Sequence, residues 1–354
     1  MKMKKVFLVV FLACLLAVTL GLGVTATIYG LVKGSEAREA DADSIEVMAE
    51  SIEQIKTYTQ VELDTLLEEE RHKSADLARG DVLTELKNGL LNGSSTVETL
   101  RTFYPNDLVL VSGGKYHFVP IKEELKKNSY LEENLVFDEN GFANYYENGS
   151  LVSYKGIDVS KFQGKIDWNK VAEAGVDFAF IRVGYRGYGE EGRLVTDVTY
   201  EDNIKGANAA GVHAGVYFYT QAITEAELLE EVDLVLQEIA PYKIDCPVVF
   251  DVEKVSGKGR MNAISVEERT NLAVLFCEKI KEAGYKPMIY LNMEMGALLL
   301  DLSRLEEYDK WFAYYNPNFY YPYAYDVWQY SDSGVVSGIP EKVDLNISFK
   351  PLWE

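Results

Sequence analysis

Two acidic residues, Asp251 and Glu253, stand two positions apart at the end of an apolar segment, CPVVFDVEKV (residues 246–255). The segment predicts a buried strand, and carboxylates are seldom buried without a partner or a function. Side chains at i and i+2 of a strand point to one face, about 6.5–7 Å apart. Repulsion at this distance raises the pKa of at least one carboxyl, which leaves a protonated acid beside a carboxylate. Glycosidic bond cleavage uses such a pair.

An isolated D-x-E pair also fits a solvated strand end or half of an ion pair. The residues around it are therefore needed to distinguish a catalytic pair from a structural one. Asp158 lies at the end of the predicted strand in GIDVS, and Asp344 lies in the short predicted strand KVDLN. Taken singly, Asp158 fits a turn cap and Asp344 a surface position. In a closed barrel, however, the first and last strands are neighbours, and chemistry gathers at the carboxyl ends of the strands. The four acids are therefore candidate catalytic residues.

Aromatic residues stand at the ends of the same predicted strands and fit a sugar-binding groove. Pyranose rings present apolar C–H faces that stack on aromatic rings. Because side chains alternate along a strand, some of these aromatics must belong to the core instead. The substrate-binding candidates are Tyr217, Tyr219, Tyr315, Trp328 and Gln329.

From Gly156 onward, apolar runs alternate with helical segments, which predicts a parallel α/β sheet. The predicted strands are Gly156–Val159, Phe178–Val183, Val212–Tyr219, Pro247–Val252 and Pro287–Leu291, and the predicted helices are Trp168–Ala174, Tyr200–Ala210, Glu225–Ile239 and Val266–Ala283. Three short strands with little helix between them follow, at Trp311–Tyr315, Asp326–Tyr330 and Lys342–Leu345. The fold class is therefore α/β, an irregular (β/α)8-type barrel over residues 153–354 whose later strands lack helices.

The N-terminal residues 1–34 predict a transmembrane anchor. Residues 6–32 carry no charge, and a spanning helix needs about 20 apolar residues. Lysines precede the segment and acidic residues follow it, which predicts a cytoplasmic N-terminus and an extracellular catalytic domain in the cell membrane. The alternative is a secreted protein cleaved after the V-T-A sequence at Val24–Ala26.

Residues 35–152 connect this segment to the barrel. Spaced aliphatic residues in 35–100 predict a helical stalk. Residues 101–152 read as a small α+β module that includes a hairpin around Gly113-Gly114. This region could contact proteins of an envelope complex, contact the substrate, or only set spacing.

The composition excludes several classes of function. The net charge of −21 argues against nucleic acid as a partner, because phosphate binding needs a basic surface. The three histidines show no spacing typical of a metal site, and GYRGYGEEG (residues 184–192) matches no nucleotide-binding pattern. We expect neither a metal nor another cofactor. Cys246 and Cys277 fit buried free thiols better than a disulfide.

Seven segments in order resemble the glycoside hydrolase family 25 lysozymes of the Chalaropsis type. They are GIDVSKFQG (156–164), FAFIRVGY (178–185), AGVYFY (214–219), VVFDVE (248–253), WFAYY (311–315), WQYS (328–331) and VDLN (343–346). The resemblance implies a modified barrel and an N-acetylmuramidase that cleaves the β-1,4 bond between N-acetylmuramic acid and N-acetylglucosamine in peptidoglycan glycan strands.

The resemblance also implies roles for residues. Glu253 matches the general acid, Asp251 its partner carboxylate, and Asp158 and Asp344 the other acids of the groove. Asp251 would then assist the substrate's own N-acetyl group as nucleophile, or a carboxylate would activate water with inversion. Two other functions stay open: a glycan-binding or assembly protein without hydrolysis, and a hydrolase of another N-acetylated glycan such as chitin.

Overall fold

The computed structural model describes residues 58–255, 257 and 259–353. The chain divides into two compact units, with the boundary between Leu83 and Thr84. Helix α3 (Gln60–Leu91) has no buried residue and includes this boundary. The predicted anchor at residues 6–32 and the first part of the predicted stalk lie outside the described residues. Within the described part of the chain, no helix is both long and apolar enough to cross a membrane.

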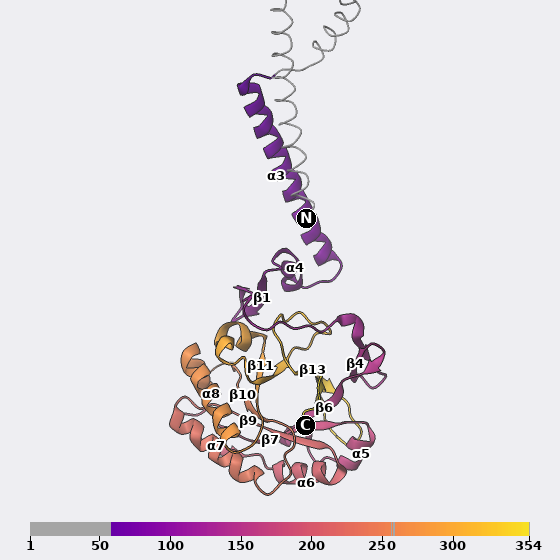
Figure 1. Cartoon of the computed structure of the whole chain (residues 1–354), viewed down its shortest axis with the longest axis vertical. Helices are drawn as coiled ribbons and strands as arrows, with labels where there is room; N and C mark the ends of the chain where they lie inside the picture. Colours follow the sequence, from indigo (N-terminus) through magenta and orange to yellow (C-terminus); the bar gives the residue numbers. More distant parts are fainter. Residues whose placement is uncertain (1–57, 256, 258, 354) are drawn as a thin grey trace, which may run out of the picture. The chain divides into compact units, whose positions relative to one another are not determined.

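Eight strands close into a barrel, as the sequence predicts (Figure 1). Neighbouring strands are parallel from the first to the seventh, whereas the last is antiparallel to both of its neighbours and closes the ring. The barrel strands are β6 (Tyr154–Val159), β7 (Phe178–Arg186), β9 (His213–Tyr219), β10 (Val248–Asp251), β11 (Pro287–Asn292), β12 (Asp309–Ala313), β13 (Val327–Gly334) and β14 (Val343–Ser348). Strand β8 (Leu194–Thr196) adds to β7 in antiparallel fashion.

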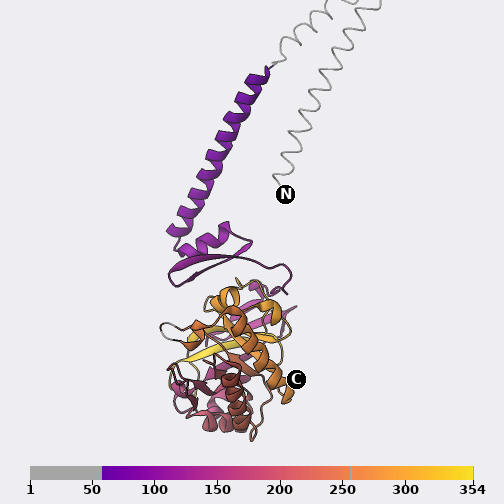
Figure 2. The ribbon, with the colours of Figure 1, turned by 90° about the vertical axis from the view of Figure 1, so that its left-hand side faces the viewer.

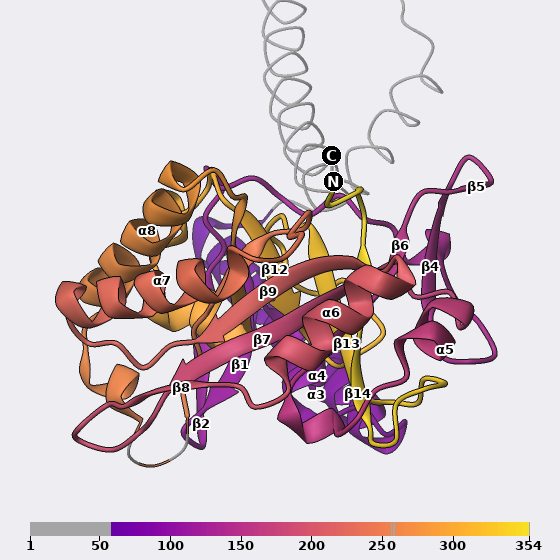
Figure 3. The ribbon, with the colours of Figure 1, turned by 90° about the horizontal axis from the view of Figure 1, so that it is seen from below.

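Four helices follow the early strands and cover the outside of the barrel (Figure 3). Ser265 begins the last of them with a capping box to Glu268, and Gly211 ends another in the left-handed conformation (φ 76°) that glycine adopts without strain. Only short helical turns follow β11, at Met295–Leu299 and Leu302–Arg304, as predicted. The helices are α5 (Trp168–Glu173), α6 (Tyr200–Ala210), α7 (Glu225–Ile239) and α8 (Val266–Glu282).

Side-chain alternation divides the barrel core into two layers. Phe178, Phe180 and Trp311 belong to a compact buried cluster, while intervening residues such as Ala179 and Ile181 belong to a larger cluster that includes helix residues. Cys246 and Cys277 are both buried and free, which confirms that prediction.

The strand register places the four candidate acids at one mouth of the barrel. Asp251, the last residue of β10, is level with Tyr219 and Tyr290 on the adjacent strands. Asp344 pairs with Asp158 across β14 and β6. Asp344 lies at the start of its strand rather than at the carboxyl end. The antiparallel direction of β14 is what brings this acid to the mouth.

The residues before the barrel form two small β-elements and a helix, within the compact unit that begins at Thr84. Helix α4 (Thr96–Phe103) precedes the hairpin of β1 (Asp107–Ser112) and β2 (Lys115–Pro120), whose turn uses Gly113 and Gly114 at positive φ, as predicted (Figure 2). A three-stranded sheet follows, made of β3 (Leu135–Phe137), β4 (Ala143–Glu147) and β5 (Ser150–Leu151). Backbone amides of both elements donate to barrel tyrosines: Val109 to Tyr320 at 2.7 Å, and Ala143 to Tyr330 at 3.0 Å.

Candidate active site

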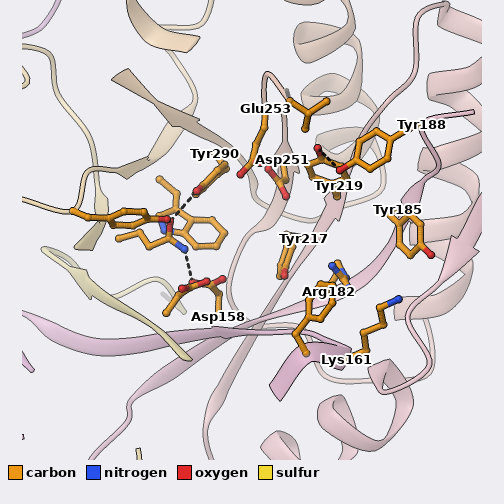
Figure 4. A pocket seen from close by; sticks show the side chains of 16 residues that line it. Asp158, Lys161, Arg182, Tyr185, Tyr188, Tyr217, Tyr219, Asp251, Glu253 and Tyr290 are labelled. Atoms are coloured by element: carbon orange, nitrogen blue, oxygen red, sulfur yellow. Dashed lines mark hydrogen bonds between the residues drawn. The ribbon is translucent and has the colours of Figure 1, made fainter. Parts of the chain in front are cut away.

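A cavity of about 450 Å³ opens at this mouth of the barrel, and all four candidate acids line it. Figure 4 labels three of them, Asp158, Asp251 and Glu253. Ligand sites in proteins commonly have volumes of about 300–1,000 Å³. Four of the five predicted substrate-binding residues also line the cavity, namely Tyr217, Tyr219, Tyr315 and Gln329.

Trp328 does not line this cavity, which corrects the expectation for that residue. It neighbours Gln329 on β13, and the alternation of side chains sends the two residues to opposite faces of the sheet. The Trp328 ring is buried beside Phe319 and Tyr330, and its indole N–H donates to the backbone oxygen of Tyr314 at 2.8 Å. Trp328 therefore packs on the face of β13 that points away from the cavity.

Asp251 is a buried carboxyl whose surroundings favour its neutral form. Burial raises its pKa well above the ordinary value, and the negative charges of Glu253 and Asp158 raise it further, while Arg182 opposes the shift. Its Oδ1 atom is buried and has no hydrogen-bond partner among the described residues. A buried acceptor without a partner is costly, so this oxygen suits a donor that arrives with a ligand.

Glu253 follows the end of β10 and is only partly exposed. Burial raises its pKa, and the charge of Asp158 raises it further, whereas a hydrogen bond with Tyr290 opposes the shift. Burial thus favours the protonated form of Glu253, and a protonated carboxyl at the wall of an open cavity can deliver its proton to a bound substrate. Glu253 therefore has the properties of a general acid.

Asp158 and Asp344 form a hydrogen-bonded pair that holds one proton. Oδ2 of Asp158 accepts from Nε2 of Gln329 at 2.8 Å and from Nδ2 of Asn346 at 2.9 Å. Burial raises the pKa of Asp158, and these amide donors oppose part of that rise. Burial and the adjacent Asp158 raise the pKa of Asp344 to about 9. The shared proton therefore resides on Asp344.

This pair predicts a specific dependence of stability on pH. A carboxyl with a raised pKa in the folded state stabilises the fold fully below its unfolded pKa of about 4, and that stabilisation is lost as the pH rises towards about 9. Asp344→Asn keeps a donor to Asp158 but cannot ionise. Between pH 5 and pH 8, the unfolding free energy of this variant should gain at least about 1 kcal/mol relative to wild type in urea titrations.

Asp233→Asn is the control, because Asp233 is an exposed acid on α7 and does not line the cavity that holds the Asp158–Asp344 pair. Its difference from wild type should be similar at both pH values. A difference for Asp344→Asn that is equally independent of pH would contradict the assignment of the proton.

Sequence reasoning missed several residues of the site. The hydroxyl of Tyr290 donates to Oε1 of Gln329 at 2.8 Å and thereby orients the amide that holds Asp158. Arg182 lines the cavity and forms an ion pair with the buried Asp197 at 2.6 Å. The arginine in the apolar run FAFIRVGY was a signal for this site, since a charged residue inside a buried strand needs a reason. Tyr290 carries no such signal.

The sequence model of the family described as glycosyl hydrolases family 25 matches residues 157–339. Asp158, Asp251 and Glu253 fall within the match, whereas Asp344 lies beyond its end. The match covers the barrel from β6 to β13. The chain belongs to this family of glycosyl hydrolases.

Two curated relatives show how far the similarity extends. The autolytic lysozyme of Clostridium acetobutylicum is 30% identical over 195 residues, which cover 54% of this chain and 55% of the relative. The uncharacterized protein YegX of Escherichia coli K12 is 31% identical over 206 residues, which cover 54% of this chain and 68% of that protein. The chain thus spans about half the length of the first relative.

Solved structures with a similar fold include a family 25 glycosyl hydrolase from Bacillus anthracis. The two chains are 23% identical, with a TM-score of 0.47, and the alignment covers 59% of this chain and 93% of the other.

Proposed function

We propose that this protein is a muramidase that hydrolyses the β-1,4 bond between N-acetylmuramic acid and N-acetylglucosamine in peptidoglycan. The observation that carries the proposal is the pairing of Asp251 and Glu253 in one cavity of a family 25 barrel. Glu253 is positioned to protonate a leaving group, and Asp251 offers a buried oxygen without a partner. Two relatives are named as lysozymes, and the structure of the autolysin LytC from Streptococcus pneumoniae was solved with a synthetic peptidoglycan ligand.

The reaction begins with proton transfer from Glu253 to the glycosidic oxygen, as the C1–O bond breaks. The carbonyl oxygen of the substrate's N-acetyl group attacks C1, and Asp251 accepts a hydrogen bond from the N-acetyl N–H through Oδ1. The resulting ring carries positive charge. This charge opposes the rise in the pKa of Asp251 and thereby favours its carboxylate form, which in turn stabilises the ring. Glu253, now ionised, then takes a proton from the water that attacks C1 and opens this ring, which restores the acid form of Glu253. Direct attack by water with inversion is the competing route.

We also propose that the enzyme is held in the cell membrane through residues 6–32, with the barrel on the extracellular side. The uncharged segment between basic and acidic flanks supports this proposal. A tether confines hydrolysis to wall close to the membrane. Residues 35–152 offer a region for partners in an envelope complex.

Analysis of the products tests the activity. The full-length protein, incubated with purified peptidoglycan, should release muropeptides that end in reducing N-acetylmuramic acid, identified by borohydride reduction and mass spectrometry. Reducing N-acetylglucosamine would contradict the proposed bond. Release of soluble fragments from chitin but not from peptidoglycan would identify a different glycan. Binding to peptidoglycan without any release would indicate a non-hydrolytic protein.

A further inference from the structure

A second cavity, of about 520 Å³, adjoins the first one at Glu253. Glu253, Tyr290 and Tyr315 line both cavities. The outer wall of the second cavity, however, comes from residues before the barrel. Val97 and Arg101 of α4, with Leu110 and Val111 of β1, line it. These four residues precede the segment that matches family 25, so this wall comes from outside the matched part of the chain.

Helix α4 is fixed to the barrel by a network centred on Arg101. Its guanidinium donates to the backbone oxygen of Val109 at 3.1 Å and to the hydroxyl of Tyr314 at 2.8 Å. The same group lies 3.7 Å from the ring centroid of Tyr320. Nearby, Nδ2 of Asn316 donates to Oε1 of Glu98 at 3.1 Å. Helix α4 therefore holds the segment after β12 that carries Tyr314, Asn316 and Tyr320.

The hairpin makes a second connection, next to the proposed general acid. Lys254 follows Glu253 directly, and its ammonium group forms an ion pair with Glu294 at 2.5 Å and donates to the hydroxyl of Ser112 on β1 at 3.3 Å. The hydroxyl of Ser112 also donates to the carboxylate of Glu294. The end of β1 thus contacts the residue adjacent to Glu253, and the hairpin and the catalytic segment share one polar cluster.

We infer that α4 and β1 form a subsite for further sugar units of the glycan strand, beyond the two units joined by the cleaved bond. This inference rests on the proposed muramidase function. The lining suits an N-acetylated sugar, because the exposed ring of Tyr315 offers a face for stacking, Asn292 offers amide groups, and Val111 contributes an apolar surface. A strand that fills both cavities passes Glu253 at their junction. Long glycan strands are therefore better substrates than short oligosaccharides.

Blocking the second cavity tests the inference. Val111 lines the cavity and is 49% exposed, so Val111→Trp places a large side chain there without disturbing a core position. The matched control is Val136→Trp on β3, a valine of 51% exposure that lines neither cavity. Each full-length protein receives a mixture of uncross-linked glycan strands and a labelled tetrasaccharide of the same repeating unit. Competition in one mixture yields the ratio of the two kcat/KM values, which does not depend on the fraction of folded enzyme.

We expect wild type and Val136→Trp to prefer the long strands, and Val111→Trp to lose about tenfold of that preference, with the rate on the tetrasaccharide retained. An unchanged ratio for Val111→Trp, or an equal loss in Val136→Trp, would overturn the subsite while leaving the muramidase function intact. If wild-type protein cleaves neither substrate, the proposed function fails and the subsite with it. The two failures are thus distinguishable.

Discussion

Glu253→Gln should lower kcat on peptidoglycan by at least about 10³-fold and leave the barrel folded. Positioned acid catalysis contributes about 10²–10⁴-fold, and an amide cannot supply the proton that the leaving oxygen needs. Because Gln has nearly the shape of the protonated acid, the hydrogen bond with Tyr290 can persist. Substrate binding should therefore change little, and the loss should appear in kcat rather than in KM.

The measurement is the release of reducing ends over time, with thermal unfolding of each variant recorded in parallel. Glu173→Gln is the control, since Glu173 is an exposed residue of α5 outside the site. It should match wild type in both assays. Activity close to wild type in a folded Glu253→Gln protein would remove Glu253 from the role of general acid.

Asp251→Asn should lower kcat by about 10²–10³-fold, because the amide keeps the shape of the side chain but not the negative charge that stabilises the charged ring. The stability of this variant, unlike its activity, should not fall. Burial raises the pKa of Asp251, so the carboxyl destabilises the fold as the pH rises above its unfolded pKa. At pH 7 the variant should therefore unfold at a urea concentration no lower than wild type does. Lost activity without lost stability is the mark of a residue retained for chemistry.

The anomeric configuration of the first product decides what Asp251 does. Assistance to the N-acetyl group gives retention, so NMR should detect the β-anomer first, before mutarotation. An α-anomer would exclude the assisted route and assign a carboxylate to the activation of water. Asp251→Asn with full activity would exclude both roles for this residue.

Local pattern was sufficient to predict most elements of the barrel. Helices α6 and α7 have the predicted bounds, since their apolar spacing, the Thr224 cap of α7 and the glycine after α6 all act within a few residues. The pairing of Asp251 with Glu253 is equally local, because strand geometry alone gives two residues at i and i+2 the same face. The acids and their place at one cavity followed from this pattern together with barrel closure.

Trp328 and Tyr290 show that local pattern does not predict which face of the barrel a strand residue points to. Both are aromatic residues of predicted strands, yet Tyr290 lines the cavity while Trp328 packs outside the barrel. Period-two alternation says that neighbours point opposite ways, but the choice of inner or outer face depends on how each strand is rotated within the closed sheet.

The sequence by itself determined the alternating strands and helices, the acidic pair and the class of chemistry that the pair can perform. The tertiary structure alone decided which acid holds a proton, because the pKa of Asp344 depends on Asp158, a residue distant in the chain that the antiparallel β14 brings alongside. It also decided that α4 and β1 extend the wall beyond Glu253. Contacts between distant segments leave no periodic signal in either segment, so burial, charge and shared cavities emerge only when the chain has folded.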